Sequence, residues 1–437
     1  MMAASVAANE SLLADTDRAL VVALRRELHR HPELAFEEYR TAARVASLLS
    51  EAGLEVRTGV ARTGVVAVLR GRAGASGSER TLLIRADMDA LPVQEVPGRD
   101  YGSAQAGVMH ACGHDGHTAM AAVAALVLAR HRDALSGNVV FAFQPAEETT
   151  GGAELMIAEG ALDDPKVDAA IAIHLANTLR VGQVAVQPGP VTAATDGFRL
   201  TIYGKGGHAA RPHLSVDPIA VAFQVGTALQ TLMTRERSPS QPAVLTIGAI
   251  HGGTVGNVIA DEVVMLGTLR TYDAALRELL KERIAAVTEG IAAALRARAS
   301  LAWDPGAYPP TINDPVITAL VRRAAETVVG PSGLVEHEPS LGGDDMAFFC
   351  AAVPGCYFRV GSGNPERGLD APHHSARFDI DEDALSIGTE ILVRAALDYL
   401  RSDAGPPGRI ATDSRQHRPR LSAITPAAGG SKDGRPD

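Results

Sequence analysis

Short, strongly apolar runs separated by helix-length segments are the feature of this sequence that most limits its fold. The runs are rich in Val, Ile and Ala, and they cover residues 64–69, 81–84, 139–143 and 169–173. Runs this short are typical of buried strands, whereas the segments between them, about 115–131 and 152–159, have the length of helices. Buried strands that alternate with helices indicate an α/β sheet.

The order of elements changes after Pro188-Gly-Pro190. From there the patterns predict strand, helix, strand, strand and helix, over 198–203, 216–234, 243–250, 258–271 and 274–296. This order resembles a small α+β open-faced sandwich inserted into the first domain. We therefore expect a discontinuous domain over 10–189 and 305–402, an insertion over 190–304, and a disordered tail over 403–437, which is rich in Pro, Gly, Ser and Arg.

Composition excludes several classes of protein. The chain has 437 residues, of which 46% are hydrophobic, so it can bury a large core without disulfides. Its net charge of −10 disfavours nucleic acid and anionic membranes as partners. Three cysteines are too few for a disulfide framework, and the longest apolar run, 119–129, is too short to span a bilayer. The N-terminus lacks the pattern of a signal peptide, so we expect a cytoplasmic protein.

The segment His110-Ala-Cys-Gly-His-Asp-Gly-His117 carries the densest chemistry. One thiol and several imidazoles within a single turn favour a metal site or a nucleophile over a buried Cys beside capping residues. We expect Asp115 to cap the following helix. The helix dipole at that position would favour a thiolate on Cys112.

Further polar residues follow other apolar runs. They are Asp87 and Asp89, the pair Glu147-Glu148, His174, and the pair His373-His374. Three of these four groups have an ordinary alternative when taken alone: a solvated helix start for the Glu pair, a hydrogen-bonded core residue for His174, and a polar loop for the last pair. Ligands of α/β sheets gather at strand ends, so together these residues indicate a metal centre.

These pieces, in this order, resemble the N-acyl-amino-acid amidohydrolases, the hippurate hydrolase and indole-acetyl-amino-acid hydrolase group of dinuclear metallopeptidases. The opening Leu28-His-Arg-His-Pro-Glu-Leu34 is also similar to that group. The resemblance covers about residues 20–401, and the CGHDGH motif followed by QPAEE is specific in combination. It implies a mixed-sheet α/β catalytic domain with helices on both faces, and an inserted sandwich that acts as a lid and dimerisation domain.

The resemblance also implies roles for individual residues. Two divalent metal ions (zinc, manganese, cobalt or nickel) would be held by Cys112, His114, Glu148, His174 and His374. Alignment on Ser375 and Phe378 selects His374 rather than His373. Glu147 would be the catalytic base, and Asp89 would orient a ligand.

The inserted domain would supply residues that reach the substrate, from the lid or from a partner subunit. His208 would help to stabilise the oxyanion. Asn257 and Arg270 would bind the substrate carboxylate, although Arg270 could equally be a solvated charge at a strand end. By analogy, we expect a homodimer.

The predicted function is metal-dependent hydrolysis of the amide bond in a small N-acyl amino acid, hippurate-like or N-acetylated. One alternative is a thiol-dependent amidase with Cys112 as nucleophile and His114 or His117 as base, and another is an inert metal-binding homologue. The sequence departs from the family pattern at Ala376 (usually Pro), at Gly343-Asp-Asp-Met346 (usually Ser-Glu-Asp-Phe) and at Thr149-Thr150 (usually Gly-Gly). These departures lie near the expected cleft and indicate an atypical substrate.

Overall fold

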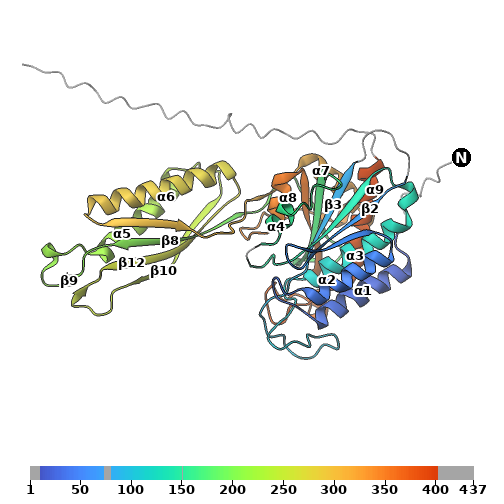
Figure 1. The fold of residues 1–437 in the computed structure, drawn as a ribbon, viewed down its shortest axis with the longest axis horizontal. Helices are drawn as coiled ribbons and strands as arrows, with labels where there is room; N and C mark the ends of the chain where they lie inside the picture. The colour runs from blue at the N-terminus through green and yellow to red at the C-terminus, as the bar shows by residue number, and fades with distance from the viewer. Residues whose placement is uncertain (1–9, 73–79, 150, 402–437) are drawn as a thin grey trace, which may run out of the picture.

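A mixed eight-stranded sheet forms the larger part of the molecule, as seen in the computed structural model, which describes residues 10–72, 80–149 and 151–401 (Figure 1). Its strand order is β1-β2-β4-β3-β5-β16-β6-β15. The strands are β1 (Glu55–Val60), β2 (Gly64–Arg70), β3 (Thr81–Asp87), β4 (Asn138–Gln144), β5 (Ala169–Arg180), β6 (Val184–Ala185), β15 (Leu334–Val335) and β16 (Gly355–Gly363). The central strands β4, β3, β5 and β16 run parallel, and β1 and β2 are antiparallel.

Helices cover both faces of this sheet. One core includes apolar residues of α1 (Asp15–Arg30), α2 (Tyr39–Glu51), α3 (His114–Arg130), α7 (Pro315–Val329) and α9 (Asp383–Arg401). The other face packs against α4 (Ala153–Ala158) and α8 (Met346–Ala352). Alternate residues of β2 point to opposite cores, because successive side chains of a strand face opposite ways. The predicted fold class of this part is confirmed.

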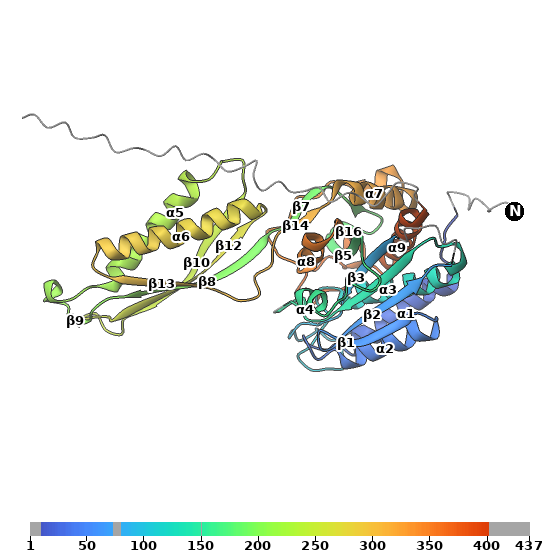
Figure 2. The same ribbon diagram turned by 45° about the horizontal axis from the view of Figure 1, so that its top comes forward.

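A second, four-stranded antiparallel sheet extends away from the first (Figure 2). Its order is β10 (Ala243–Gly252), β12 (Glu262–Thr271), β8 (Ala194–Tyr203) and β13 (Arg298–Trp303). The helices α5 (Pro218–Arg235) and α6 (Ala274–Ala294) share one core with this sheet. Asp217 and Asp273 cap these helices through their side chains. This is the expected open-faced sandwich.

Two strand predictions in the second sheet need correction. The sequence patterns did not predict β13, and they extended the preceding helix through residue 296. The predicted strand 258–271 is in fact divided into β11 (Val258–Ile259) and β12. Only β12 belongs to the four-stranded sheet. The strand β11 pairs instead with β9 (Gly207–His208), and between β11 and β12 the Asp261 side chain accepts a hydrogen bond from the Gly206 amide.

Both connections between the two sheets pass through one small ribbon, in which β7 (Gly189–Thr192) pairs with β14 (Thr311–Asn313). The second sheet begins and ends within the predicted insertion 190–304, and the domain boundaries themselves stay a prediction. The predicted tail, 403–437, lies outside the described residues, as does Thr150. Among the helices that the structure describes, none is long and apolar enough to cross a membrane.

Candidate metal centre

The polar residues singled out by the sequence meet at one edge of the large sheet. Asp87 ends β3, the Glu147-Glu148 pair follows β4, and His174 lies in β5. These strands are parallel, so their carboxyl ends share an edge, as α/β ligand sites do. A cavity of about 600 Å³ opens there, and its lining includes Cys112, Glu147, Glu148, His174, His373 and His374.

All five predicted metal ligands lie close together. Three overlapping groups have ligand atoms within 4.8 Å of one another: Cys112–His114–His174, Cys112–Glu148–His374 and His114–Glu147–Glu148. The Cys112 Sγ is 3.6 Å from His174 Nε2, and His374 Nε2 is 3.1 Å from Glu148 Oε1. The structure therefore brings together the predicted set, whereas its role in binding metal stays a prediction.

The protonation pattern of these side chains suits a cation. His114 Nδ1 lies 2.9 Å from the Asp89 carbonyl, and His174 Nδ1 lies 2.6 Å from the Leu175 carbonyl. We assign a proton to each Nδ1, which leaves each Nε2 with a free lone pair. Within the described part of the chain, the buried His114 Nε2 has no hydrogen-bond partner. Buried ring nitrogens without a partner are rare, and a bound cation would satisfy this one.

Asp89 holds the two adjacent carboxylates in place. Its Oδ1 and Oδ2 accept hydrogen bonds of 3.0 Å from the backbone amides of Glu147 and Glu148. Oδ1 also lies 3.3 Å from His114 Nδ1. These contacts fit the orienting role that the resemblance implied, although that role stays a prediction.

Glu147 is buried among other acids. Burial and the nearby Asp344 and Asp345 carboxylates raise the pKa of Glu147 well above its usual value. Burial, together with Asp344, also raises the pKa of Asp345 to about 7, although Arg85 opposes the shift. The Arg85 guanidinium is itself buried and contacts Asp345 at 2.7 Å. A group with a raised pKa in a cleft is a candidate for proton transfer.

Asp115 does not cap helix α3, so that prediction was wrong. The N-cap is Gly113, whose φ of 93° suits a residue without a side chain, and no side chain caps the helix. Asp115 lies inside the first turn and pairs with the buried Arg25 at 2.9 Å. Burial raises the pKa of the Cys112 thiol well above its usual value. Without a cation, Cys112 is therefore a poor nucleophile, which counts against a thiol mechanism.

Two residues near the site, His117 and Tyr308, have no role in the predicted metal mechanism but support its geometry. His117 Nδ1 lies 2.7 Å from Asp87 Oδ1, and its Nε2 accepts a hydrogen bond from the Leu175 amide, so it fixes the strand beside His174. The Tyr308 hydroxyl donates to the Glu147 carbonyl at 2.8 Å. The spacing of His117 from His114 along a helix was a usable signal, whereas no local pattern marks Tyr308.

The predicted residues of the inserted domain divide into two groups. Arg270 lines the cavity, beside the candidate metal centre. His208 and Asn257 are exposed, and His208 belongs to β9, at the end of the second sheet remote from the large sheet (Figure 1). This chain therefore does not place His208 or Asn257 in its own cavity.

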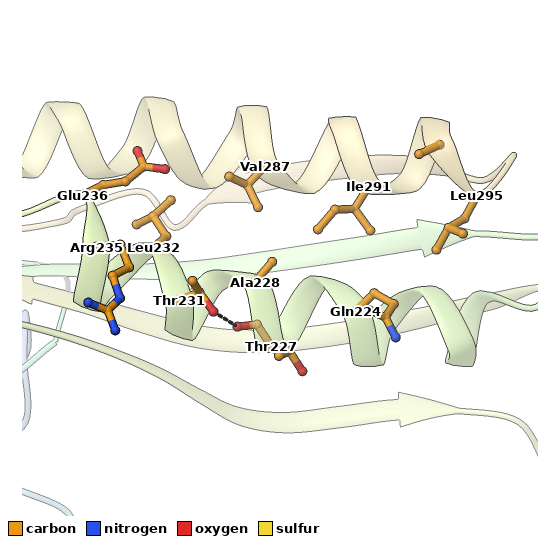
Figure 3. Close-up of a pocket in the computed structure, with 11 residues that line it drawn as sticks. Gln224, Thr227, Ala228, Thr231, Leu232, Arg235, Glu236, Val287, Ile291 and Leu295 are labelled. Carbon is orange, nitrogen blue, oxygen red and sulfur yellow. Dashed lines mark hydrogen bonds between the residues drawn. The ribbon is translucent and has the colours of Figure 1, made fainter.

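Another cavity, of about 570 Å³, lies between α5 and α6 (Figure 3). Its lining is largely aliphatic and includes Leu232, Val287 and Ile291, with Arg235 and Glu236 at one end. It contains no set of metal-ligating side chains. The chemistry of the molecule is therefore concentrated at the sheet edge.

Comparison with known proteins agrees with this geometry. Residues 83–398 match the model of peptidase family M20/M25/M40. The chain belongs to this family. It is therefore a member of a group of hydrolases that includes amidohydrolases and peptidases, and the predicted family is confirmed.

Relatives with high coverage include enzymes and a solved structure. The chain is 40% identical over 383 residues to the N-acetyl-L-cysteine deacetylase of Bacillus subtilis, covering 88% of this chain and 89% of the relative. It is 37% identical to the IAA-amino acid hydrolase ILR1-like 4 of Arabidopsis thaliana, covering 87% and 86%. The YXEP protein of Bacillus subtilis, described as a dinuclear metal-binding peptidase of the M20 family, superposes with a TM-score of 0.75 at 34% identity, covering 89% and 99%.

Proposed function

We propose that this protein is a metal-dependent amidohydrolase that cleaves the amide bond of a small N-acyl amino acid, hippurate-like or N-acetylated. The observation that carries the proposal is the Glu147 carboxylate beside a compact set of metal-ligating atoms in a cavity. The names of the relatives support the substrate class, because a deacetylase of N-acetyl-cysteine and a hydrolase of indole-acetyl-amino acids both act on N-acyl amino acids.

Two divalent cations fit the available donors. The residues that would hold them are Cys112, His114, Glu148, His174 and His374. When bound, the ions would polarise the amide carbonyl and lower the pKa of water in the site. A thiolate with imidazoles suits zinc, and the mixed nitrogen and oxygen set also suits manganese, cobalt or nickel.

The protein's own groups perform the proton transfers in this proposal. Glu147 accepts a proton from the attacking water and delivers it to the nitrogen of the leaving amine. The contacts of Asp89 with the backbone amides fix the direction of Glu147, and the Tyr308 hydroxyl holds its carbonyl. Arg270 binds the carboxylate of the amino acid, because its guanidinium faces the cavity.

His208 and Asn257 would need a second copy of the chain to take part in the reaction. Both lie far from this chain's cavity, on the outer end of the second sheet. We propose a homodimer in which each copy supplies these residues to the cavity of the other. We also propose a cytoplasmic location, supported by the free state of Cys112, Cys350 and Cys356.

The experiment that tests the function measures amino acid released from hippurate, N-acetyl amino acids and an indole-acetyl conjugate. We expect release that a chelator abolishes and zinc or manganese restores. The Glu147→Gln variant should retain two metal ions by elemental analysis and lose about 100-fold or more in turnover. Glu289→Gln, an exposed change on α6, should behave as wild type.

Other outcomes separate the alternatives. Release that survives complete metal removal and disappears in Cys112→Ser would establish a thiol amidase instead. A protein that holds two metals and releases nothing from any substrate would be an inert homologue. Near-normal turnover of metal-loaded Glu147→Gln would remove Glu147 as the base.

A further inference from the structure

Two arginine side chains from different sheets enter the candidate active-site cavity. Arg270 comes from the end of β12, and Arg359 comes from β16. In the parallel register of β16 and β5, Arg359 is paired with His174. Neighbouring strands place paired residues on the same face, so Arg359 lies beside a candidate metal ligand.

Arg270 has no counter-charge of its own. Its guanidinium forms no hydrogen bond or ion pair with any residue that the structure describes, and the nearby acid, Asp196, is paired elsewhere. Asp196 is near enough to affect the pKa of Arg270, but both its oxygens are engaged by Arg277, at 2.7 and 2.8 Å, and Lys281 is also in contact. The guanidinium is half-buried, and partial burial lowers the pKa of Arg270.

Arg359 lacks an acceptor for a different reason. Its Nη1 lies 2.9 Å from His337 Nδ1, which is its closest polar contact among the described residues. That same Nδ1 lies 2.6 Å from the Glu338 carbonyl. A ring nitrogen has either a proton or a lone pair, so it cannot donate to the carbonyl and also accept from Arg359. The shorter contact assigns the proton to Nδ1, and the Arg359 guanidinium is left without an acceptor.

The acids of the cavity do not neutralise these arginines. Glu147 and Glu148 belong to the candidate metal centre. Asp344 lies 3.4 Å from Arg85 and accepts a hydrogen bond from the Tyr357 hydroxyl. Neither Arg270 nor Arg359 forms an ion pair within the described ranges. Partly buried guanidinium groups usually have an anionic partner, so an anion is expected from the ligand.

We propose that the substrate carries two carboxylates, of which Arg270 binds one and Arg359 binds the other. This inference rests on the proposed function and narrows it to N-acyl amino acids with a second carboxylate. The second carboxylate is either the side chain of an acidic amino acid or the far end of a dicarboxylic acyl group. Arg359 is thus a specificity-determining residue, and the neutral His337 ring limits the directions that its guanidinium can take.

The test compares acids with amides of nearly equal shape. One pair is N-acetyl-L-glutamate and N-acetyl-L-glutamine, and the other is N-succinyl-L-alanine and N-succinamoyl-L-alanine. In the wild-type protein we expect kcat/KM for the acid to exceed that for its amide by about tenfold or more in one pair. The pair that shows the preference identifies which half of the substrate carries the second carboxylate.

Variants assign the preference to one side chain. Arg359→Gln should reduce the acid-to-amide ratio of kcat/KM to near one. Its kcat/KM for the amide should stay within about threefold of the wild-type value, because an amide forms no ion pair with Arg359. Arg359→Lys should retain part of the ratio, since the charge remains without the planar fork. Arg180→Gln is the matched control, because Arg180 is exposed on β5 and pairs with Glu366 outside the cavity. The acid-to-amide ratio of kcat/KM in this variant should equal that of wild type.

Each contrary result has a definite meaning. Metal-dependent release with an acid-to-amide ratio near one in both wild-type pairs overturns this inference and leaves the proposed function standing. An equal loss on all substrates in Arg359→Gln also overturns it, because the role would then be structural. Absence of release from every N-acyl amino acid overturns both proposals. Even if Arg359→Gln fails to fold, the wild-type ratios alone decide whether the protein prefers a substrate with a second carboxylate.

Discussion

Adjacent residues at the start of α3 face opposite sides of the fold, and this division organises the site. His114 points to the candidate metal centre, whereas Asp115 pairs with Arg25 and His29 in the interior. His29 in turn contacts Glu95 at 3.3 Å. These buried charges connect α1, α3 and the loop after β3. Since removal of one partner leaves a buried charge unpaired, the network is expected to matter for stability.

Glu95 provides a test of this network through pH. Burial alone would raise the pKa of Glu95, but hydrogen bonds from His29, the Ser103 amide and Arg99 outweigh it and lower the pKa to about 2. A carboxyl whose pKa is lowered by folding stabilises the protein above its unfolded pKa of about 4.5, and this contribution is lost as pH falls toward 2. We expect Glu95→Gln to unfold at lower urea than wild type at pH 7, by on the order of 1–3 kcal/mol.

The difference between the two proteins should shrink through that acid range, as measured by urea denaturation at several pH values. Glu55→Gln, at an exposed ion pair with Arg70, is the control and should follow wild type at every pH. A gap between wild type and Glu95→Gln that stays constant from pH 7 to pH 2 would show that the Glu95 charge does not stabilise the fold.

Single residues also show what the sequence could and could not reveal about the site. The predicted ligands Cys112, His114 and Glu148 stand in compact motifs, in which residue type and spacing indicated a metal site and the family resemblance selected the individual ligands. Arg359 and His337 lie in separate segments, and only pairing of β16 with β5 brings Arg359 to the cavity. Likewise, the far position of His208 depends on β9 pairing with β11, which no local pattern encodes.

Secondary structure elements were predictable where their pattern was uniform. The buried strands β2, β3 and β4 are continuous apolar runs, and each was predicted within a few residues. Strand β13 was missed because its exposed and half-buried residues alternate and it starts soon after α6 ends. Strand β16 was missed because Arg359 interrupts an otherwise apolar run. Helix α7, which was not predicted, begins with a clear start signal in the Asp314 cap and Pro315.

The loop between β4 and the short helix α4 is tightly packed at the start of the helix. Gly152, at its N-cap, is buried, and a Cβ there would lie 2.1 Å from the Pro145 carbonyl oxygen. Because Pro145 directly precedes the segment that carries Glu147 and Glu148, a displaced backbone would move both carboxylates. We expect Gly152→Ala to lower stability by on the order of 1–3 kcal/mol and to weaken metal binding, measured by thermal unfolding and by titration of the metal-free protein.

Gly290→Ala is the matched control for that change. Gly290 lies in the exposed face of α6, and a Cβ there would meet nothing within 4 Å. Since Ala favours helix more than Gly, this variant should be stabilised by about 0.5–1 kcal/mol with unchanged metal affinity. Gly152→Ala with wild-type stability and metal affinity would mean that the loop tolerates displacement.

At the scale of the whole molecule, the second sheet contributes only some of its predicted site residues to the cavity at the edge of the large sheet. Arg270 extends from the second sheet into the cavity, close to the β7–β14 ribbon that joins the two parts. The opposite end of the second sheet presents His208 to solvent. A site that needs both residues is therefore complete only in an assembly, and the elongated shape gives His208 the reach to serve another copy (Figure 2).

Complementation between two inactive variants measures this directly. If His208 serves the partner's cavity, mixed dimers of His208→Ala and Glu147→Gln contain one site with both intact residues. Random pairing of equal amounts should then restore about a quarter of wild-type activity, because about half of the dimers are mixed and each has one competent site. If His208 acts within its own chain, the same mixture stays inactive. A control mixture of wild type with the double variant separates the two cases again: about a quarter of the activity remains when His208 acts across the dimer, and about half when it acts within one chain.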